Sequence, residues 1–456
     1  MFLDRKISFR WFLLLIIFGI LVLVFFGASV LHSVQGGKSL GKFGQLALHV
    51  ASFPSLVKQI FTKELQVIDG NVVTSLQIIK NKYPELDGFK VKKSLPEGVS
   101  RDTGYILSSV FDAKMNHTKV QLIRVADQKT IYQWQPDIDE LKAKENAFKP
   151  EVNYKAQNFR IQNPVLLKDG SLVFHGQQGP ILFKIDGCSK VKWTAQGHFH
   201  HSVDMGSDGS FWVPTVIKPQ SYPEFQEFRD DAIAHISADG KSLSKVSVTK
   251  ILIDNGYRGL ALASFSKDPI HVNDIQVVLS DSKYWKKGDL FMSFRHKNMI
   301  MLYRPSNEKI IWLKTGPWVQ QHDVSVISDH EISVFGNDSI SGQLKNDCHY
   351  LDGHSNVYIY DFKTDQVATP YKNMMEKLQV KTCGQGRSRI LKGGNVFIEE
   401  TASGRLMMLS KNTVEWQYVS KISAEYLAMF SWSRYLTKEE VEPILPALKE
   451  SNCSKN

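Results

Sequence analysis

The sequence predicts an all-β protein, a six-bladed β-propeller, preceded by one N-terminal transmembrane helix and a short, partly helical neck. Three observations lead to this prediction. Short runs rich in Val, Ile, Phe and Tyr alternate with turn clusters of Asp, Gly, Asn and Lys from about residue 101 onward, which is the pattern of strands and hairpins. These runs recur as a unit of two hairpins. An uncharged apolar stretch near the N-terminus is long enough to cross a bilayer.

The composition is that of a globular protein. The 456 residues are 43% hydrophobic and 22% charged, which excludes a wholly disordered or collagen-like chain. The 4 cysteines are too few for a scaffold built on disulfides. The net charge of +10 favours anionic substrates, and we expect no nucleic-acid partner.

The N-terminal segment divides at the apolar run. Residues 1–10 carry Arg5, Lys6 and Arg10, whereas residues 11–32 are apolar and uncharged. The positive-inside rule predicts a cytoplasmic N-terminus, a transmembrane signal anchor at 11–32, and a C-terminal domain on the periplasmic or extracellular side of the membrane. A cleaved signal peptide stays open, because the small residues 27–29 suit a cleavage site. An oxidising compartment permits disulfides among the four cysteines, which the sequence alone does not pair.

Residues 33–100 are predicted to form the neck. The segments 55–65 and 75–83 have roughly helical apolar spacing. The basic stretch 88–94 breaks this pattern, and we interpret its lysines as a solvated face rather than as a lipid contact.

The propeller is assigned to residues 101–436. The clearest first hairpin is 165–174, in which two apolar runs flank Asp169-Gly170. Further first hairpins are expected at 203–213, 275–292, 324–335 and 389–398. Second hairpins, most of which end near a tryptophan, are expected at 181–193, 232–248, 299–312, 357–367 and 406–416. With the less regular unit 104–134 at the start, the units number six, as in a six-bladed propeller.

Helices are expected only outside the propeller. We find no helical pattern of about 10 to 15 residues between 101 and 435, which argues against a parallel βαβ fold. Residues 437–456 are predicted to form a C-terminal helix and tail, because Thr437-Lys438-Glu439-Glu440 is a capping box.

Three of the repeated units open with a histidine. They read His201-Ser-Val-Asp-Met, His271-Val-Asn-Asp-Ile and His322-Asp-Val-Ser-Val. In a propeller the first strand of each blade lines the central channel, so equivalent strand starts converge at one end of it. We therefore expect three imidazoles to meet at the mouth of the channel.

Other polar residues are expected in the same ring. Asn273 lies two residues after His271, so both side chains belong to one face of the strand. Arg295 ends the strand that pairs with it, Asn337 holds the matching place in the next blade, and Arg387 opens the last one. Imidazoles, amides and guanidinium groups together suit the binding of an oxyanion.

In order and content, the motifs between residues 200 and 399 resemble the bacterial arylsulfotransferase family. The resemblance is carried by His271-Val-Asn, Ser293-Phe-Arg-His, Gln321-His-Asp-Val, Phe335-Gly-Asn-Asp and the run 386–399. Members of that family are six-bladed propellers. They move a sulfuryl group from a phenolic sulfate to another phenol through a transiently sulfated histidine, without a nucleotide or other cofactor.

The resemblance also implies roles for individual residues. It puts the nucleophile at His322, and the residues around the sulfuryl group at His201, His271, Asn273 and Arg295. His200 is an alternative match for His201. The expected substrate-binding residues are His200, Asn337 and Arg387. The expected partners are an aryl sulfate donor, a phenolic acceptor and, through residues 11–32, the membrane.

The chemistry agrees with the resemblance, and two other functions stay open. A neutral imidazole suits attack on an aryl sulfate, because the sulfate oxygens repel an anionic nucleophile. Three converging histidines could instead bind zinc or iron in a metal-dependent hydrolase or oxygenase, although Arg295 argues against a nearby dication. The third reading is a non-enzymatic, membrane-anchored binding propeller.

Overall fold

The structure is a computed structural model that describes residues 9–34, 46–47, 50–51, 66–68, 71–73, 75, 77–92, 102–148, 156–263, 266–341, 348–451 and 453. The chain forms two compact units, Met1–Val72 and Val73–Asn456. Each unit is treated by itself below.

The first unit contains the helix α1 (Phe9–Val34). Within it, Arg10–His32 is a stretch of 23 residues with a mean hydropathy of 3.0. Its length and apolar composition are those of a membrane-spanning helix, and a signal sequence near an N-terminus has the same properties. The strands β1 (Gln66–Ile68) and β2 (Asn71–Val73) pair with each other.

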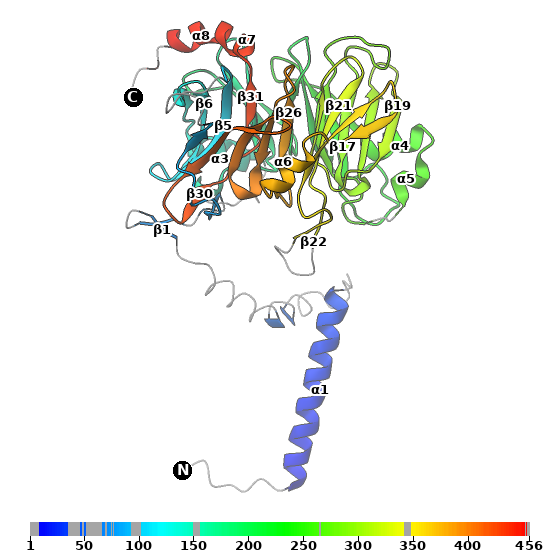
Figure 1. Cartoon of the computed structure of the whole chain (residues 1–456). Coiled ribbons are helices and arrows are strands. Elements are labelled where there is room, and N and C mark those ends of the chain that lie inside the picture. Colours follow the sequence, from blue (N-terminus) through cyan, green and yellow to red (C-terminus); the bar gives the residue numbers. More distant parts are fainter. Residues whose placement is uncertain are drawn as a thin grey trace. The chain divides into compact units, whose positions relative to one another are not determined.

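The second unit is a propeller-like array of antiparallel sheets (Figure 1). The described residues of this unit form five four-stranded sheets, one larger sheet and one two-stranded hairpin. The first two sheets are β31 (Arg434–Leu436), β5 (Tyr105–Asp112), β6 (His117–Arg124), β7 (Lys129–Trp134), and β8 (Ile161–Leu166), β9 (Leu172–Gly176), β10 (Ile181–Ile185), β11 (Val191–Gln196). The next two are β12 (Asp204–Met205), β13 (Phe211–Ile217), β14 (Asp230–Ile236), β15 (Ser242–Ser247), and β16 (Val272–Val277), β17 (Leu290–Phe294), β18 (Met299–Arg304), β19 (Lys309–Thr315).

The fifth sheet has the order β20 (Asp323–Val326), β21 (Glu331–Gly336), β24 (Asn356–Asp361), β25 (Gln366–Ala368), and a hairpin of β22 (Ser339–Ser341) and β23 (Cys348–Tyr350) lies between its second and third strands in the chain. The larger sheet begins with β26 (Arg387–Ile390), β27 (Val396–Glu400), β28 (Arg405–Leu409), β29 (Val414–Lys421). It continues with β30 (Tyr426–Ala428) and β3 (Ile78–Lys80), and β4 (Phe89–Val91) pairs with β29.

Neighbouring sheets bury their faces against each other, as propeller blades do. Leu172 and Phe174 of β9 pack toward the β5–β7 sheet, whereas Val173 packs toward the β12–β15 sheet. This alternation is the period of two of a strand that is buried on both faces. Further hydrophobic clusters join β12–β15 with β16–β19, β16–β19 with the fifth sheet, and the fifth sheet with β26–β29.

The C-terminal end of the chain joins the array to its beginning. The strand β31 pairs with β5, where Tyr435 lies opposite Ile106 (Figure 1). Between the larger sheet and this one, the rings of Phe397 and Tyr435 lie 5.9 Å apart. Asp102 accepts hydrogen bonds from the indole of Trp416 at 2.7 Å and from the hydroxyl of Tyr435 at 2.5 Å.

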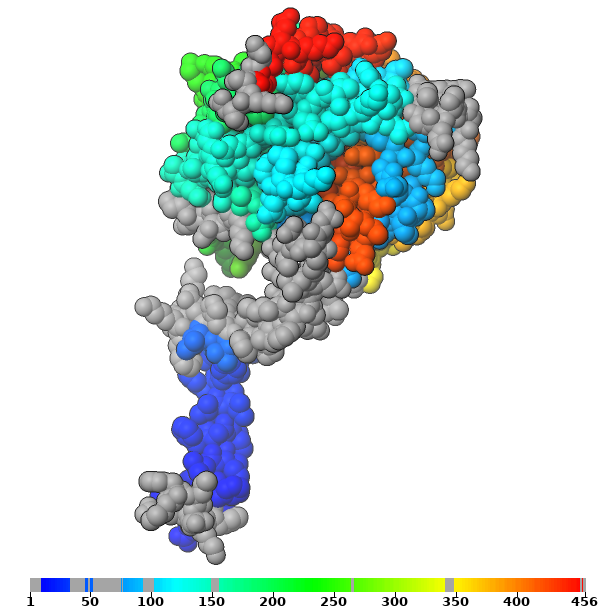
Figure 2. All heavy atoms as spheres, turned by 90° about the vertical axis from the view of Figure 1, so that its left-hand side faces the viewer, coloured from blue at the N-terminus to red at the C-terminus, as the bar shows by residue number. Residues whose placement is uncertain are grey.

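The predicted neck is partly wrong. The segment 75–83 contains the strand β3 rather than a helix, and β3 and β4 extend the larger sheet. Figure 2 shows this part of the chain, in blue, beside the orange strands. The predicted helix at 55–65 lies outside the described residues.

Helices also interrupt the β-rich region, contrary to the prediction. The longest is α3 (Ile138–Phe148), whose N-terminus is capped by the carboxylate of Asp137. The others are α4 (Val248–Asp254), α5 (Arg258–Leu262), α6 (Lys372–Lys377), and the short 3₁₀ turns η1 (Ala156–Asn158), η2 (Arg295–Lys297) and η3 (Thr401–Ser403).

The predicted C-terminal helix exists in pieces. The capping box of Thr437 and Glu440 is present at the start of α7 (Lys438–Val441), and η4 (Glu442–Ile444) and α8 (Leu445–Glu450) follow, each with a proline in its first turn. Their apolar side chains pack on the β5–β7 and β8–β10 strands. Figure 2 shows these red elements lying over the cyan strands.

All four cysteines are paired in disulfides. Cys188 bonds to Cys453 and so ties the C-terminal tail to the β10–β11 turn. Cys348 bonds to Cys383 and so ties β23 to the segment that precedes β26.

Candidate active site

Each sheet presents one residue in the left-handed backbone conformation just before, or within, its innermost strand. These residues have φ between 46° and 60° and are Asn163, His201, His271, Gln320, Gln385 and Trp432. A non-glycine residue in this conformation costs about 1 to 3 kcal/mol. Its recurrence therefore marks one structurally equivalent position in successive sheets.

This position corrects the predicted alignment of the three histidines. His201 and His271 occupy the left-handed position. In the next sheet Gln320 occupies it, and His322 lies two residues later. His322 is therefore level with Asn273 rather than with His271. The prediction that the three histidines are in register is wrong by two residues.

Aspartates three residues after the left-handed position support this register. They are Asp204, Asp274 and Asp323. Each accepts a hydrogen bond from a backbone N–H of the following sheet, at 2.7, 3.0 and 3.0 Å, from Val277, Val324 and Ser388. Burial raises the pKa of all three carboxyl groups, and the guanidinium of Arg387 opposes this on each of them. The carboxylates bind adjacent sheets together beneath the histidines.

The three predicted imidazoles nevertheless meet. The ring centroid of His201 lies 5.2 Å from that of His271 and 6.0 Å from that of His322. The exposed fractions are 2% for His322 and 8% for His201, and His271 is also largely covered. The structure thus brings one imidazole from each of three consecutive sheets into one cluster, called the histidine ring below.

His322 is held from behind by two hydrogen-bond acceptors. Its Nδ1 lies 2.7 Å from Oδ1 of Asn337 and 3.1 Å from the carbonyl oxygen of Gln320. The Asn337 amide is oriented by its own donation to the carbonyls of Thr382 and Gln385 at 2.7 and 2.8 Å. Because both partners only accept, Nδ1 carries the hydrogen and Nε2 carries the lone pair of the neutral ring.

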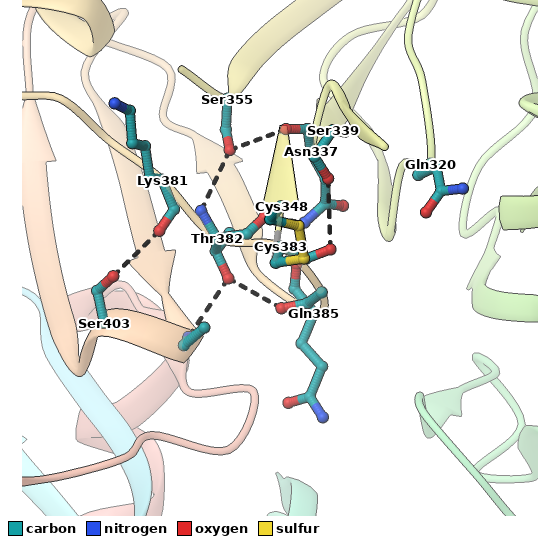
Figure 3. The surroundings of a disulfide bond; sticks show 12 residues. Gln320, Asn337, Ser339, Cys348, Ser355, Lys381, Thr382, Cys383, Gln385 and Ser403 are labelled. Atoms are coloured by element: carbon teal, nitrogen blue, oxygen red, sulfur yellow. Dashed lines mark hydrogen bonds between the residues drawn. A yellow bond between two sulfur atoms is a disulfide. The ribbon is translucent and has the colours of Figure 1, made fainter. Parts of the chain in front are cut away.

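Asn337 rests on the segment that the Cys348–Cys383 disulfide anchors. Figure 3 shows Thr382 beside this disulfide, with Gln385 below it and Asn337 above it. Asn337 is fully buried, and its described partners are protein groups. In the structure Asn337 contacts His322, and its expected contact with substrate stays a prediction.

His201, and not His200, takes part in the ring. The Nδ1 atoms of the two imidazoles are 2.8 Å apart, so one of them donates and the other accepts. Nε2 of His200 lies 3.4 Å from the buried carboxylate of Asp231, which Arg229 also contacts at 2.7 Å. His200 therefore supports His201 and links it to Asp231.

His271 has a carboxylate partner. Its Nδ1 lies 2.5 Å from Oδ2 of Asp268, and its ring packs on that of His296 with centroids 4.5 Å apart. Nδ1 of His296 lies 2.6 Å from the backbone oxygen of Asp268. Burial by itself would raise the pKa of the Asp268 carboxyl. The hydrogen bond and the charge interaction with His271 outweigh this effect, so the pKa of Asp268 lies below its ordinary value.

Three buried N–H donors near the ring have no hydrogen-bond acceptor among the described residues. They are Nε of Arg295, Nη1 of Arg387 and Nε1 of Trp432. The indole of Trp432 lies 6.2 Å from the ring of His201, and the guanidinium of Arg387 lies 5.7 Å from that indole. A buried donor without an acceptor costs about 1 to 3 kcal/mol. An anion bound here would supply the missing acceptors.

The other predicted residues are fixed by protein contacts. Nη2 of Arg295 donates to Oε1 of Gln320 at 2.6 Å. Nδ2 of Asn273 donates to the backbone oxygen of Gln321 at 2.7 Å, next to His322, and its Oδ1 has no described partner. Asn273 thus holds the segment before β20 that carries His322.

The surroundings of His322 and His201 favour the neutral form of these two imidazoles. The pKa of His322 lies well below its ordinary value, because the ring is buried and the Arg295 charge opposes protonation, although the Asn337 hydrogen bond acts in the opposite direction. The pKa of His201 is lowered in the same way, by burial and then by His200, His271 and His322. Burial also lowers the pKa of Arg295. A neutral Nε2 on His322 is available as a nucleophile at pH 7.

A metal site formed by the ring itself finds no support in the geometry. Within the described part of the chain, the groups whose donor atoms approach closely enough to share an ion are Asp268, His271, His296 and His330, Glu331, Asp361. His201, His271 and His322 together are not such a group. The predicted alternative of a three-histidine metal enzyme therefore has no matching cluster in this region.

Comparison with protein families identifies the chain. A sequence model described as Arylsulfotransferase (ASST) matches residues 163–421, more than half of the chain and all of the histidine ring. The chain belongs to the arylsulfotransferase family. Membership supports an arylsulfotransferase activity in general terms, and so a transferase rather than a non-enzymatic binding protein. Among curated proteins, no sequence matches this arylsulfotransferase.

Three solved structures are distantly similar to this chain. A protein of unknown function from Bacteroides caccae has a TM-score of 0.46 and 11% identity, covering 74% of this chain and 99% of its own. The WD40 β-propeller domain of Doa1 has a TM-score of 0.40 and 14% identity, covering 78% and 95%. A virginiamycin B lyase from Staphylococcus aureus has a TM-score of 0.34 and 10% identity, covering 59% and 72%. These similarities are too low to inform the function.

Two residues of the site escaped the sequence-based prediction. Asp268 lies in the loop before β16, three residues before His271, and nothing in its sequence context distinguishes it from a turn aspartate. Trp432 precedes β31, which no hairpin pattern announces. The signal that could have found Trp432 is the need for one more innermost strand to complete the β5–β7 sheet.

Proposed function

We propose that this arylsulfotransferase moves a sulfuryl group from a phenolic sulfate ester to a phenolic acceptor through a sulfated His322, without a nucleotide or other cofactor. The observation that carries the proposal is the buried His322, with its lone pair fixed on Nε2, in a ring that also holds unpaired N–H donors. Family membership supports the general activity.

In the first half-reaction, Nε2 of His322 attacks the sulfur of the donor and the bond between sulfur and the phenolic oxygen breaks. The free N–H groups of Arg295 and Trp432 bind the sulfuryl oxygens, whose charge grows as the transition state forms. A low pKa keeps His322 neutral and therefore nucleophilic. A protonated imidazole of the ring donates a proton to the departing phenolate.

In the second half-reaction, the acceptor phenol takes the place of the first phenol. Its oxygen attacks the sulfur, the bond between sulfur and Nε2 breaks, and the imidazole that gave up its proton receives the acceptor's proton. Asn337 holds His322 in the same orientation through both steps. Donor and acceptor thus use one site in turn, and no nucleotide is needed to carry the sulfuryl group.

We extend the proposal to the architecture. Counting β26–β29 of the larger sheet as a blade gives a six-bladed propeller, and the left-handed position that recurs six times supports this count. The blades belong to residues 101–436, with β3 and β4 of the predicted neck added. We also propose that α1 is a single-pass anchor with the catalytic unit outside the cytoplasm, which two disulfides support.

Acceptor-dependent turnover of 4-nitrophenyl sulfate tests the activity. The full chain in detergent, with its disulfides intact, should release 4-nitrophenolate when a phenol is added and form the sulfated phenol in equal amount. The same protein carrying His322→Gln should do neither. Release without formation of a sulfated acceptor would indicate a hydrolase. No release from a panel of aryl sulfates and phenols would overturn the proposed function.

A further inference from the structure

The described contacts give His271 a different environment from the other two imidazoles of the ring. His322 is held by a neutral amide and a carbonyl, and His201 is held by another imidazole. His271 is held by a carboxylate, at 2.5 Å from Nδ1 to Oδ2 of Asp268. The second oxygen of Asp268, Oδ1, is buried and has no hydrogen-bond partner among the described groups.

The position of Asp268 is set independently of His271. The ring of His296 contacts its backbone oxygen at 2.6 Å, and the backbone N–H of Arg229 donates to the neighbouring carbonyl of Lys267 at 2.7 Å. The backbone around Asp268 is therefore held in place by these contacts, and it presents the carboxylate to Nδ1 of His271.

We infer that Asp268 is a positioning residue that makes His271 the proton carrier of the transfer reaction. The inference rests on the proposed function and deepens it. With Nδ1–H bonded to the carboxylate, Nε2 of His271 is the nitrogen left to exchange protons with the phenolic oxygens. The negative charge of Asp268 stabilises the imidazolium that forms whenever His271 holds the extra proton.

The proton balance closes over one cycle. As Nε2 of His322 bonds to sulfur, the bond from sulfur to the aryl oxygen breaks, and the proton on Nε2 of His271 moves to that oxygen. When the acceptor oxygen bonds to sulfur and the bond from sulfur to His322 breaks, the acceptor's proton returns to Nε2 of His271. Asp268 stays ionised throughout, and no oxidant or further reactant takes part.

This role has a signature that a structural role would not have. Phenol is a poor leaving group and needs the proton from His271, whereas 4-nitrophenol is more acidic and leaves as its anion with little help. Asp268→Asn keeps an acceptor against Nδ1 and removes the charge, and Asp268→Ala removes both. The losses should therefore depend on the donor used.

The experiment compares the full chain and its variants with phenyl sulfate and with 4-nitrophenyl sulfate. In Asp268→Asn, kcat/KM should fall about 100- to 1000-fold for phenyl sulfate and less than about 10-fold for 4-nitrophenyl sulfate. Asp329→Asn is the matched control. Asp329 also contacts a histidine, with its Oδ1 2.5 Å from Nδ1 of His330, but this pair lies on the surface. This control should behave as the wild type with both donors.

A second readout does not depend on turnover. In the full chain labelled with ¹⁵N-histidine, the Nδ1–H of His271, assigned with His271→Gln, should give a strongly downfield proton signal that Asp268→Ala removes. Equal losses of rate with both donors, or a spectrum unchanged by Asp268→Ala, would overturn the inference. So would loss of activity on chelation and its recovery with zinc, since Asp268, His271 and His296 would then hold a metal ion. Failure of the proposed function would show instead as a wild type without turnover beside an intact His271 signal.

Discussion

The replacement Asn337→Leu tests how the fold supports the nucleophile. It keeps the branching and the number of non-hydrogen atoms of the side chain and removes three hydrogen bonds, one from His322 and two to the carbonyls of Thr382 and Gln385. His322 keeps the carbonyl of Gln320 as a partner. The groups left without a hydrogen bond are therefore the carbonyls of Thr382 and Gln385. At about 1 to 3 kcal/mol for each buried group left unpaired, the free energy of unfolding should fall by about 2 to 6 kcal/mol.

That loss is a large part of the total stability of a domain, about 5 to 15 kcal/mol. Urea unfolding followed by tryptophan fluorescence measures it, and kcat/KM should fall because the tautomer of His322 is less firmly fixed. Asn356→Leu is the matched control, since this buried amide has one described hydrogen bond, to Asp338, which Tyr358 also holds. It should cost less stability and leave kcat/KM unchanged. Equal stability and equal rates in the two variants would refute the reasoning.

Three further predictions concern the ring, the pH dependence and the N-terminal strands. His271→Ala or Arg295→Ala should lower kcat about 100- to 1000-fold without changing the urea midpoint, and a variant that keeps more than a tenth of the rate would lose its role. Burial lowers the pKa of His175 to about 4, so the unfolded chain binds a proton there that the folded chain does not as pH falls below about 6.5. The free energy of unfolding should therefore fall as the pH is lowered from about 6.5 to 4, with about 3 kcal/mol of the loss from this residue. In His175→Gln this contribution to the loss should vanish. The same dependence of unfolding free energy on pH in the variant and the wild type would contradict the prediction. A chain that starts at residue 101 should unfold at lower urea concentration than one that starts at residue 73, because it lacks β3, β4 and the buried Leu86; identical midpoints would mean that these strands do not stabilise the propeller.

The blade rhythm could be predicted because hairpins are local. Both strands of 165–174 lie within ten residues of each other, and their alternation and turn residues are visible in the sequence. The strands β3 and β4 pair with strands more than 300 residues away, so the sequence around them does not indicate which strands they pair with. The helix α3 did have a local signal, the capping Asp137 with two acidic residues in the first turn, and that signal was missed.

The histidine ring could be predicted in composition but not in register. The similar sequence motifs at His201, His271 and His322 were enough to predict that the imidazoles converge, and they do. The motifs align the wrong residues, because in the sheet that begins with β20 the left-handed position is occupied by Gln320 and not by His322. The aspartates Asp204, Asp274 and Asp323 are the better markers, since each must reach the next sheet from the same place.

Partners that lie in loops could not be predicted. Asp268 reaches His271 only because the loop before β16 turns its carboxylate back toward Nδ1. Asn337 was predicted as a substrate contact, because its place after β21 suggested an open channel position. Two of its three hydrogen bonds go to the segment around Cys383, which leads into the following blade.

The central claim is that the sulfuryl group passes through His322, and its covalent trapping tests this most directly. The full chain is mixed with excess 4-nitrophenyl sulfate in the absence of acceptor, quenched rapidly in alkali, which protects the acid-labile bond between nitrogen and sulfur, and digested for mass spectrometry. The account predicts a burst of 4-nitrophenolate of about one per active site and one added SO₃ group on the peptide that contains His322. A linear release without a burst and without a modified peptide, or an SO₃ group on another histidine, would contradict it.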